Sequence, residues 1–131
     1  MKKDRLLNPS IVEAVAALGH TEHLVIADCG LPIPKDTKVI DVSVTSGIPS
    51  FLDVLKAVNS ELVIEGAILA SEIDDANPKL KSAICSELGD VPVRQIPHEQ
   101  FKDLLKSVKI IIRTGEVLSY ANVILVGGVN F

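Results

Sequence analysis

Apolar and polar residues follow two different periods along this chain, and together they indicate an α/β fold. Short continuous apolar runs rich in Ile, Val and Leu, such as LVIA at 24–27, are typical of strands buried on both faces. Apolar residues spaced three and four apart, as in SFLDVLKAV at 50–58, indicate helices with one buried face. The pattern predicts helices over 8–19, 49–58, 77–88 and 97–108, and strands over 23–29, 38–44, 61–71, 91–96, 109–116 and 122–129.

The order of these elements favours a sheet that is mainly parallel. Strands that alternate with helices form parallel units whose helices cover both faces of the sheet. The last two strands follow each other at a hairpin's distance, so we expect an antiparallel strand pair at the C-terminal end. The predicted fold is a Rossmann-like α/β sheet with helices on both faces, in which residues 1–131 form a single domain without internal repeats.

Composition and charge narrow the functional classes. The formal net charge is −4 and no cluster of Lys or Arg is present, which argues against a nucleic-acid partner. No apolar run approaches the ~20 residues that span a bilayer, and the first ten residues show no apolar signal segment, so we expect a cytoplasmic protein outside the membrane. In a reducing compartment, Cys29 and Cys85 are expected to stay thiols.

Polar residues flank the first predicted strand. Asp28 follows the apolar run where the chain leaves the sheet, and open α/β sheets bind ligands at such strand ends; an equally good interpretation is that Asp28 caps the turn. His20 follows the helix stop Gly19 and could instead serve the C-terminal dipole of the first helix. Because His-x-x-His outside a helix is a weak metal signal, we expect His23 to be solvated. We expect Cys29 to act as a small hydrophobe.

A second group of polar residues lies nearer the C-terminus. His98 follows a predicted strand and begins a predicted helix, where the helix dipole favours a neutral imidazole. Tyr120 and Asn122 alternate around Ala121, so in strand geometry their side chains point the same way and could bind one ligand. The alternative is an ordinary hairpin with polar residues facing water. These residue types suit proton transfer to a polyhydroxyl ligand at neutral pH.

The sequence resembles, from end to end, the family of D-ribose pyranases and L-fucose mutarotases. The stretches that carry the resemblance are LGHTEHLVIADCGLP at 18–32, HEQF at 98–101, IRTGEVLSYANVIL at 112–125 and the closing GGVNF. GLP after Asp28 and YAN at 120–122 are similar to the ribose branch, since the fucose branch tends to have His-Phe-Pro and Tyr-Gly-Asn there. Two positions depart from the family pattern: Cys29 stands where Ala is common, and Glu22 where Asp is common.

The resemblance implies a reaction, a site and an assembly. The reaction is the interconversion of β-D-ribopyranose and β-D-ribofuranose by acid–base ring opening and closing, with no cofactor and no metal. His20 would be the catalytic proton donor. The residues that would bind the sugar are Asp28, His98, Tyr120, Ala121 and Asn122. The family also implies a homo-oligomer, a decamer, with each D-ribose site at a junction between subunits.

Two other functional classes stay open at this point. A non-catalytic ribose-binding protein, acting with a transporter or kinase, would bind the sugar without speeding its exchange. A metal-dependent hydrolase would use His20, His23 and Asp28 as ligands and would hold metal in stoichiometric amount.

Overall fold

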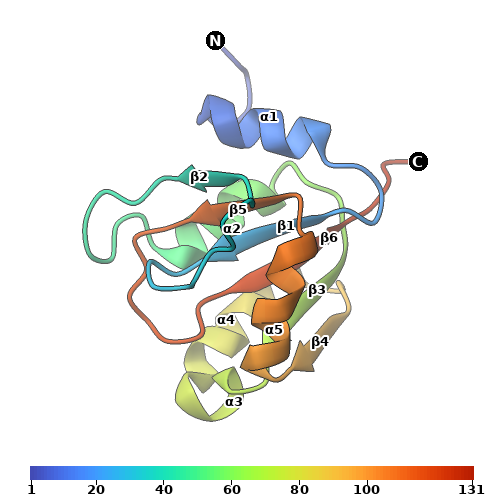
Figure 1. Ribbon diagram of the computed structural model, residues 1–131. Coiled ribbons are helices and arrows are strands. Elements are labelled where there is room, and N and C mark those ends of the chain that lie inside the picture. Colours follow the sequence, from blue (N-terminus) through green and yellow to red (C-terminus); the bar gives the residue numbers. More distant parts are fainter.

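The computed structural model describes residues 1–131 and has a six-stranded sheet at its centre (Figure 1). The strands are β1 (His23–Ala27), β2 (Val39–Asp41), β3 (Ile64–Ala70), β4 (Val93–Ile96), β5 (Ile110–Arg113) and β6 (Val123–Gly127). Their order across the sheet is β2-β5-β1-β6-β3-β4. All six predicted strands are present, although β2 is shorter than its apolar run.

The sheet is mainly parallel, as the sequence predicts, and its antiparallel pairing comes from the last strand. β1 pairs with β5 in parallel, as do β2 with β5 and β3 with β4. β6 lies between β1 and β3 and is antiparallel to both. The final two strands therefore do not pair with each other as the expected hairpin. Residues 114–122 are long enough to cross over β1, which separates β5 from β6.

Six helical segments flank the sheet. They are α1 (Pro9–Ala17), α2 (Phe51–Asn59), α3 (Ile73–Ala76), α4 (Pro78–Leu88), α5 (His98–Leu104) and the 3-10 turn η1 (Leu105–Ser107). Three of these helices begin with a capping residue. The side chain of the residue before each helix accepts a hydrogen bond from a backbone N–H of its first turn, as seen for Asn8, Ser50 and Asn77. The short α3 was not predicted, because four residues carry too little periodicity.

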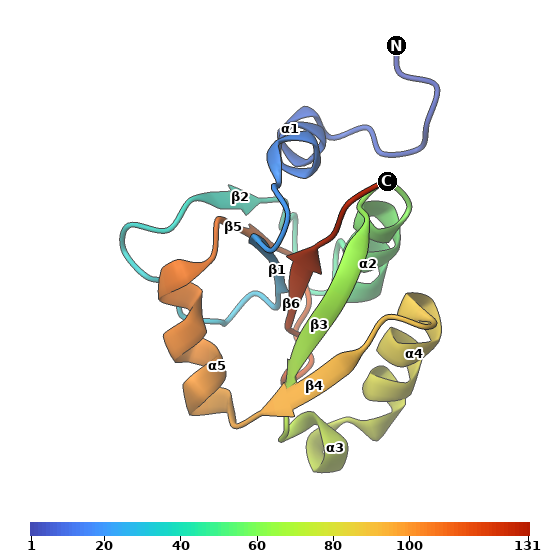
Figure 2. The same ribbon diagram turned by 90° about the vertical axis from the view of Figure 1, so that its right-hand side faces the viewer.

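Helices cover both faces, which confirms the expected layering (Figure 2). In β1, Leu24 and Ile26 join the larger apolar cluster beneath α1, α2 and α4, whereas Val25 and Ala27 join the smaller cluster beneath α5. Successive strand residues point to opposite faces, so a strand buried on both sides needs apolar residues at every position. That requirement explains the uninterrupted run LVIA.

This topology gathers several loops at one edge of the sheet. β1, β5, β3 and β4 all end at that edge, and the antiparallel β6 begins there. Residues that are far apart in the sequence, such as Asp28 and Asn122, thereby come into contact. No helix has the length and the apolar run needed to cross a membrane.

Candidate functional site

A pocket of about 330 Å³ opens at this edge of the sheet. It is lined by residues 28–32 after β1, by His98 at the start of α5, and by residues 116–120 after β5. The sequence pattern placed polar residues at the ends of strands, and the structure brings three of them, Asp28, His98 and Tyr120, to this one pocket. The pocket is therefore the candidate ligand site.

Asp28 has both of the roles that its sequence position suggests. One carboxylate oxygen accepts the Gly30 N–H at 2.8 Å, which caps the turn after β1. The other accepts the Asn122 amide N–H at 2.8 Å, and the Asp28 backbone N–H donates to the Asn122 side-chain oxygen at 2.8 Å. Asp28 is thus fixed from two sides while it lines the pocket.

The segment 120–122 does not have the strand geometry that we expected. β6 begins only at Val123, and Tyr120 has a left-handed backbone with φ 60°. The Tyr120 ring lines the pocket, Ala121 is fully buried in the larger core cluster, and Asn122 is 1% exposed. A turn rather than a strand therefore separates the three side chains, and Asn122 acts first as the partner of Asp28.

His98 is held at the pocket by contacts on both its backbone and its ring. Its backbone N–H donates to the two carboxylate oxygens of Glu72 at 3.1 and 3.0 Å, so Glu72 caps α5 in place of a side chain from the preceding loop. The ring stacks on Phe101 and meets the Tyr120 ring edge-on, with centroids 5.2 Å apart. Its Nδ1 is buried and has no hydrogen-bond partner within the chain.

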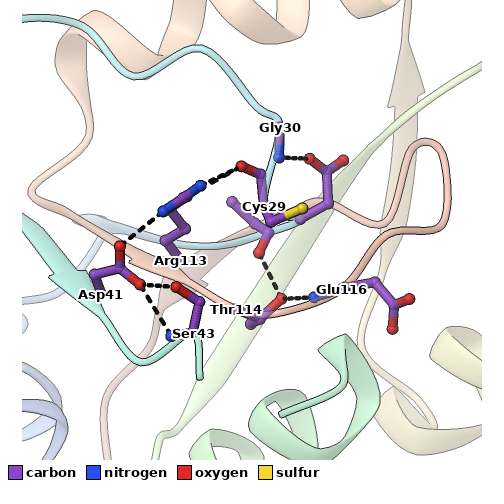
Figure 3. A network of polar contacts seen from close by, with 9 residues as sticks. Cys29, Gly30, Asp41, Ser43, Arg113, Thr114 and Glu116 are labelled. Atoms are coloured by element: carbon purple, nitrogen blue, oxygen red, sulfur yellow. Dashed lines mark hydrogen bonds and ion pairs between the residues drawn. The ribbon is translucent and has the colours of Figure 1, made fainter. Parts of the chain in front are cut away.

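Arg113 holds the backbone of Cys29, the residue that follows Asp28, by hydrogen bonds (Figure 3). Its guanidinium donates to the Cys29 carbonyl at 3.1 and 2.6 Å and to the Asp41 carboxylate at 2.8 Å. Hydrogen bonds from the Ser43 hydroxyl and backbone, and then from Arg113, lower the pKa of Asp41 from its usual value. The ionised Asp41 keeps Arg113 directed at the turn.

A buried carboxylate organises the opposite wall of the pocket. Glu116 accepts the backbone N–H groups of Phe51, Val117 and Leu118 at 3.0–3.1 Å. Its own backbone N–H donates to the Thr114 hydroxyl. The sequence places Glu116 between two strands but does not indicate this role, because one of its partners lies 65 residues away.

His20 lies outside this pocket, at the opposite end of β1 from Asp28. Its Nε2 is 2.9 Å from a carboxylate oxygen of Glu65, and its side chain is 54% exposed. At the C-terminus of α1, the Lys109 ammonium donates to the Ala17 carbonyl at 2.8 Å. One chain thus holds the pocket and this imidazole at separate places.

The two remaining candidates are His23 and Cys29. His23 is half-buried rather than solvated, and burial, followed by the charge of Arg94, lowers the pKa of its imidazole. Cys29 is half-buried at the rim of the pocket, as a free thiol. Since His20 and His23 precede or begin β1 and Asp28 follows it, the three ligands of the hydrolase alternative are not brought together.

Comparison with known proteins agrees with this geometry. Residues 1–130 match the RbsD / FucU transport protein family. The chain belongs to this family. A D-ribose pyranase of Geobacillus kaustophilus is 53% identical over all of this chain and 96% of its own, and one of Clostridium novyi is 47% identical over the whole of both. The structure of Bacillus subtilis RbsD complexed with D-ribose matches the whole of both chains with a TM-score of 0.96 and 40% identity.

Membership of the RbsD / FucU family confirms the resemblance seen in the sequence motifs and the fold class drawn from them. A FucU structure from Bifidobacterium longum, 24% identical with a TM-score of 0.81, shows the same fold. Three carboxylates hold parts of the structure that carry candidate residues. The motifs did not single out Glu65 or Glu72, and they contain Glu116 without indicating its role.

Proposed function

We propose that this protein is a D-ribose pyranase, which interconverts β-D-ribopyranose and β-D-ribofuranose. The observation that carries the proposal is the pocket of Asp28, His98 and Tyr120 in a chain that matches curated D-ribose pyranases over its full length. The Bacillus subtilis relative is described as complexed with D-ribose, and it shares this fold along the whole chain. The activity supports the uptake and use of ribose.

The reaction requires proton transfer and little else. In ring opening, the bond between the anomeric carbon and the ring oxygen breaks, the ring oxygen gains a proton, and the anomeric hydroxyl loses one to give an aldehyde. In ring closure, the C4 hydroxyl adds to the aldehyde carbon and loses its proton, while the aldehyde oxygen gains one. No hydride moves and no covalent enzyme intermediate is needed, so amino-acid acids and bases are sufficient.

The pocket offers the groups that hold a sugar. The Asp28 carboxylate can accept hydrogen bonds from hydroxyl groups, and the His98 imidazole, which lines the pocket, can bind a hydroxyl or relay a proton. Tyr120 supplies a hydroxyl and an apolar ring face. Asn122 and Ala121, which are 1% and 0% exposed, support the pocket from beneath, and the Asn122 amide N–H holds the Asp28 carboxylate in place.

His20 is proposed as the catalytic proton donor, acting in the pocket of a second copy of the chain. The length of β1 supports this assignment: five strand residues separate the two ends by roughly 16 Å, far beyond the reach of a side chain. An imidazole titrates near neutral pH, and positioned acid–base catalysis contributes on the order of 10²–10⁴-fold. Contact between the His20 end of one copy and the Asp28 end of the next would complete a site.

The exposed apolar residues suit such a contact. Val44, Ile48, Val117 and Leu118 are exposed near the pocket end. A groove of about 440 Å³ lies at the other end, lined by α1, residues 61–63 and residues 128–131. A contact between two different surfaces repeats around a ring if the rotation closes. We propose a homodecamer built from such rings, located in the cytoplasm, with D-ribose as ligand.

Magnetisation-exchange NMR on ribose at equilibrium tests the activity. The intact protein should speed exchange between pyranose and furanose signals, and His20→Ala should slow this by at least about tenfold while leaving the assembly intact by native mass spectrometry. Broadening of the ribose signals without faster exchange would show a binding protein instead. Full exchange in His20→Ala would remove His20 as the acid.

Subunit mixing tests whether His20 and Asp28 act from different copies. His20→Ala and Asp28→Asn are each expected to be inactive alone. In oligomers reassembled from an equal mixture, about a quarter of the junctions should combine an intact His20 with an intact Asp28, and exchange should return to that extent. Mixed oligomers without recovered exchange would contradict a shared site.

A further inference from the structure

Glu65 is the polar side chain that the structure places against His20. Its carboxylate oxygen lies 2.9 Å from His20 Nε2, and the two residues are 45 positions apart in the sequence. We propose that Glu65 is a positioning residue, which orients the His20 imidazole. The inference rests on the proposed function, in which His20 is the acid.

The backbone beneath Glu65 is shaped for this contact. The pairing between β3 and β6 shifts register between Ile64 and Gly66, so an irregularity of the sheet coincides with Glu65. Irregularities of this kind re-aim side chains and are frequent beside active sites. The residues after β6 continue beside the start of β3, since the Gly128 N–H donates to the Val63 carbonyl at 2.8 Å.

The backbone beneath His20 is held as firmly. His20 and Thr21 form the centre of a turn closed by the Glu22 N–H to the Gly19 carbonyl at 3.1 Å. Thr21 has φ 66°, a left-handed conformation that costs a β-branched residue energy and persists only where neighbours enforce it. Here Gly127 enforces it: its carbonyl accepts the Thr21 N–H at 2.8 Å and its own N–H donates to the Glu22 carbonyl at 2.9 Å.

The turn at residues 19–22 packs closely against the end of β6. A Cβ on Gly127 would lie 2.8 Å from the Gly19 carbonyl oxygen, so only glycine lets β6 approach the turn this closely. The chain between α1 and β1 passes beside the end of β6 in Figure 2. Imidazole and carboxylate are thus both carried on constrained backbone, unlike two long side chains that meet by chance on a surface.

Other charged groups on this turn are already paired. The Glu22 carboxylate accepts the Lys109 ammonium and the Gly19 N–H, both at 2.6 Å. The hydrogen bond from Lys109, followed by that from Gly19, lowers the pKa of Glu22. Glu65 is therefore the carboxylate left to act on His20.

The contact also decides which ring nitrogen does the chemistry. With Nε2–H directed at Glu65, Nδ1 of the imidazolium is the nitrogen that gives its proton to the sugar ring oxygen, and ring closure returns a proton to it. Glu65 is 40% exposed and His20 54% exposed in the single chain. Covering by a second copy would lower the local dielectric and strengthen the pairing.

Glu65→Gln tests the proposal, because it keeps the shape and removes the charge. At neutral pH we expect ribose exchange to slow about tenfold with the KM for ribose changed less than about twofold, since the residue does not touch the sugar. Glu65→Asp keeps the carboxylate and should restore part of the rate. Asp74→Asn, at a carboxylate paired with Lys81 outside both the pocket and the groove, is the matched control and should leave the exchange rate and the KM unchanged.

Native mass spectrometry and a double-variant cycle separate the outcomes. In a His20→Ala background, Glu65→Gln should slow exchange no further, because Glu65 acts through the imidazole. A further loss in that background, or an unchanged rate in Glu65→Gln alone, overturns the proposal. A fully active His20→Ala variant would overturn the acid assignment and this inference together, whereas an inactive His20→Ala with a normal Glu65→Gln would overturn only the role of Glu65. If Glu65→Gln fails to assemble, Glu65→Asp decides: its shorter side chain should slow exchange in part with little change in KM, and a wild-type rate overturns the proposal.

Discussion

Replacing Glu116 by Gln tests how the wall of the pocket is held. The Glu116 side chain is buried, with the residue 7% exposed. One carboxylate oxygen accepts the Phe51 N–H at the start of α2, and the other accepts the N–H groups of Val117 and Leu118. Glutamine has the same shape but carries an NH₂ group in place of one oxygen. At least one backbone N–H must then face another donor.

The expected loss of stability follows from these contacts. A hydrogen bond to a charged group contributes roughly 1.5–3 kcal/mol and a neutral one about 1 kcal/mol, so losing one charged bond and weakening others removes about 3–4 kcal/mol. A neutral amide costs less to bury than a carboxylate, which returns roughly 1–2 kcal/mol. We therefore expect Glu116→Gln to lower the free energy of unfolding by about 2 kcal/mol.

Urea unfolding measures this change. Variant and wild type must be compared at one protein concentration, because assembly adds to apparent stability. Glu99→Gln, at a carboxylate whose side chain is 83% exposed, should change the free energy of unfolding by less than about 0.5 kcal/mol. A Glu116→Gln protein within about 0.5 kcal/mol of wild type would refute the view that the carboxylate is essential to this loop.

Three further predictions concern the same edge of the sheet. Asp41→Asn should lower the free energy of unfolding at pH 7 but not at low pH. Hydrogen bonds, first from Ser43, lower the pKa of Asp41, so its carboxylate stabilises the fold above the ordinary value of 3.8 and stops doing so as the pH falls through the lower folded value. The urea midpoints of variant and wild type should therefore converge in acid. Thr114→Val removes a buried hydroxyl that donates to the Ala27 carbonyl at 2.8 Å and should cost about 1–2 kcal/mol in urea unfolding; no change would contradict a structural role for that bond. Tyr120→Phe should weaken ribose binding several-fold in calorimetry with little change in the unfolding midpoint, and unchanged binding would remove the hydroxyl from the site.

The elements of the fold could be predicted from the sequence, whereas the pairing of the last strands could not. Apolar periodicity and caps such as Asn8 and Asn77 locate helices, because both signals are local. Which strand lies beside which depends on contacts across the whole chain. A fully apolar strand such as β1 must be covered on both faces and paired on both edges, and it therefore takes the place between β5 and β6 that a hairpin would have closed.

The same distinction applies to the site. Asp28 and His98 could be predicted because both follow apolar runs, and strand ends of one direction meet at one edge. The Asn122 contact with Asp28 joins residues 94 positions apart, and the Glu72 cap on α5 joins residues 26 apart. Neither has a local signal. The side chains of Tyr120 and Asn122 were predicted to point the same way, because their alternation around Ala121 has the same appearance in a strand and in a turn. The left-handed backbone of Tyr120 is visible only in the structure.

The position of His20 shows why a single chain does not account for the proposed chemistry. β1 keeps His20 and Asp28 at opposite ends, and no change of side-chain conformation spans a five-residue strand. Glu65 and the tight turn nevertheless hold His20 in a defined orientation, although one chain offers it no ligand pocket. Such constraint has a use if a neighbouring copy supplies the sugar. On this argument a separated subunit keeps the groups that bind ribose but lacks a proton donor beside them, so catalysis depends on assembly while binding does not.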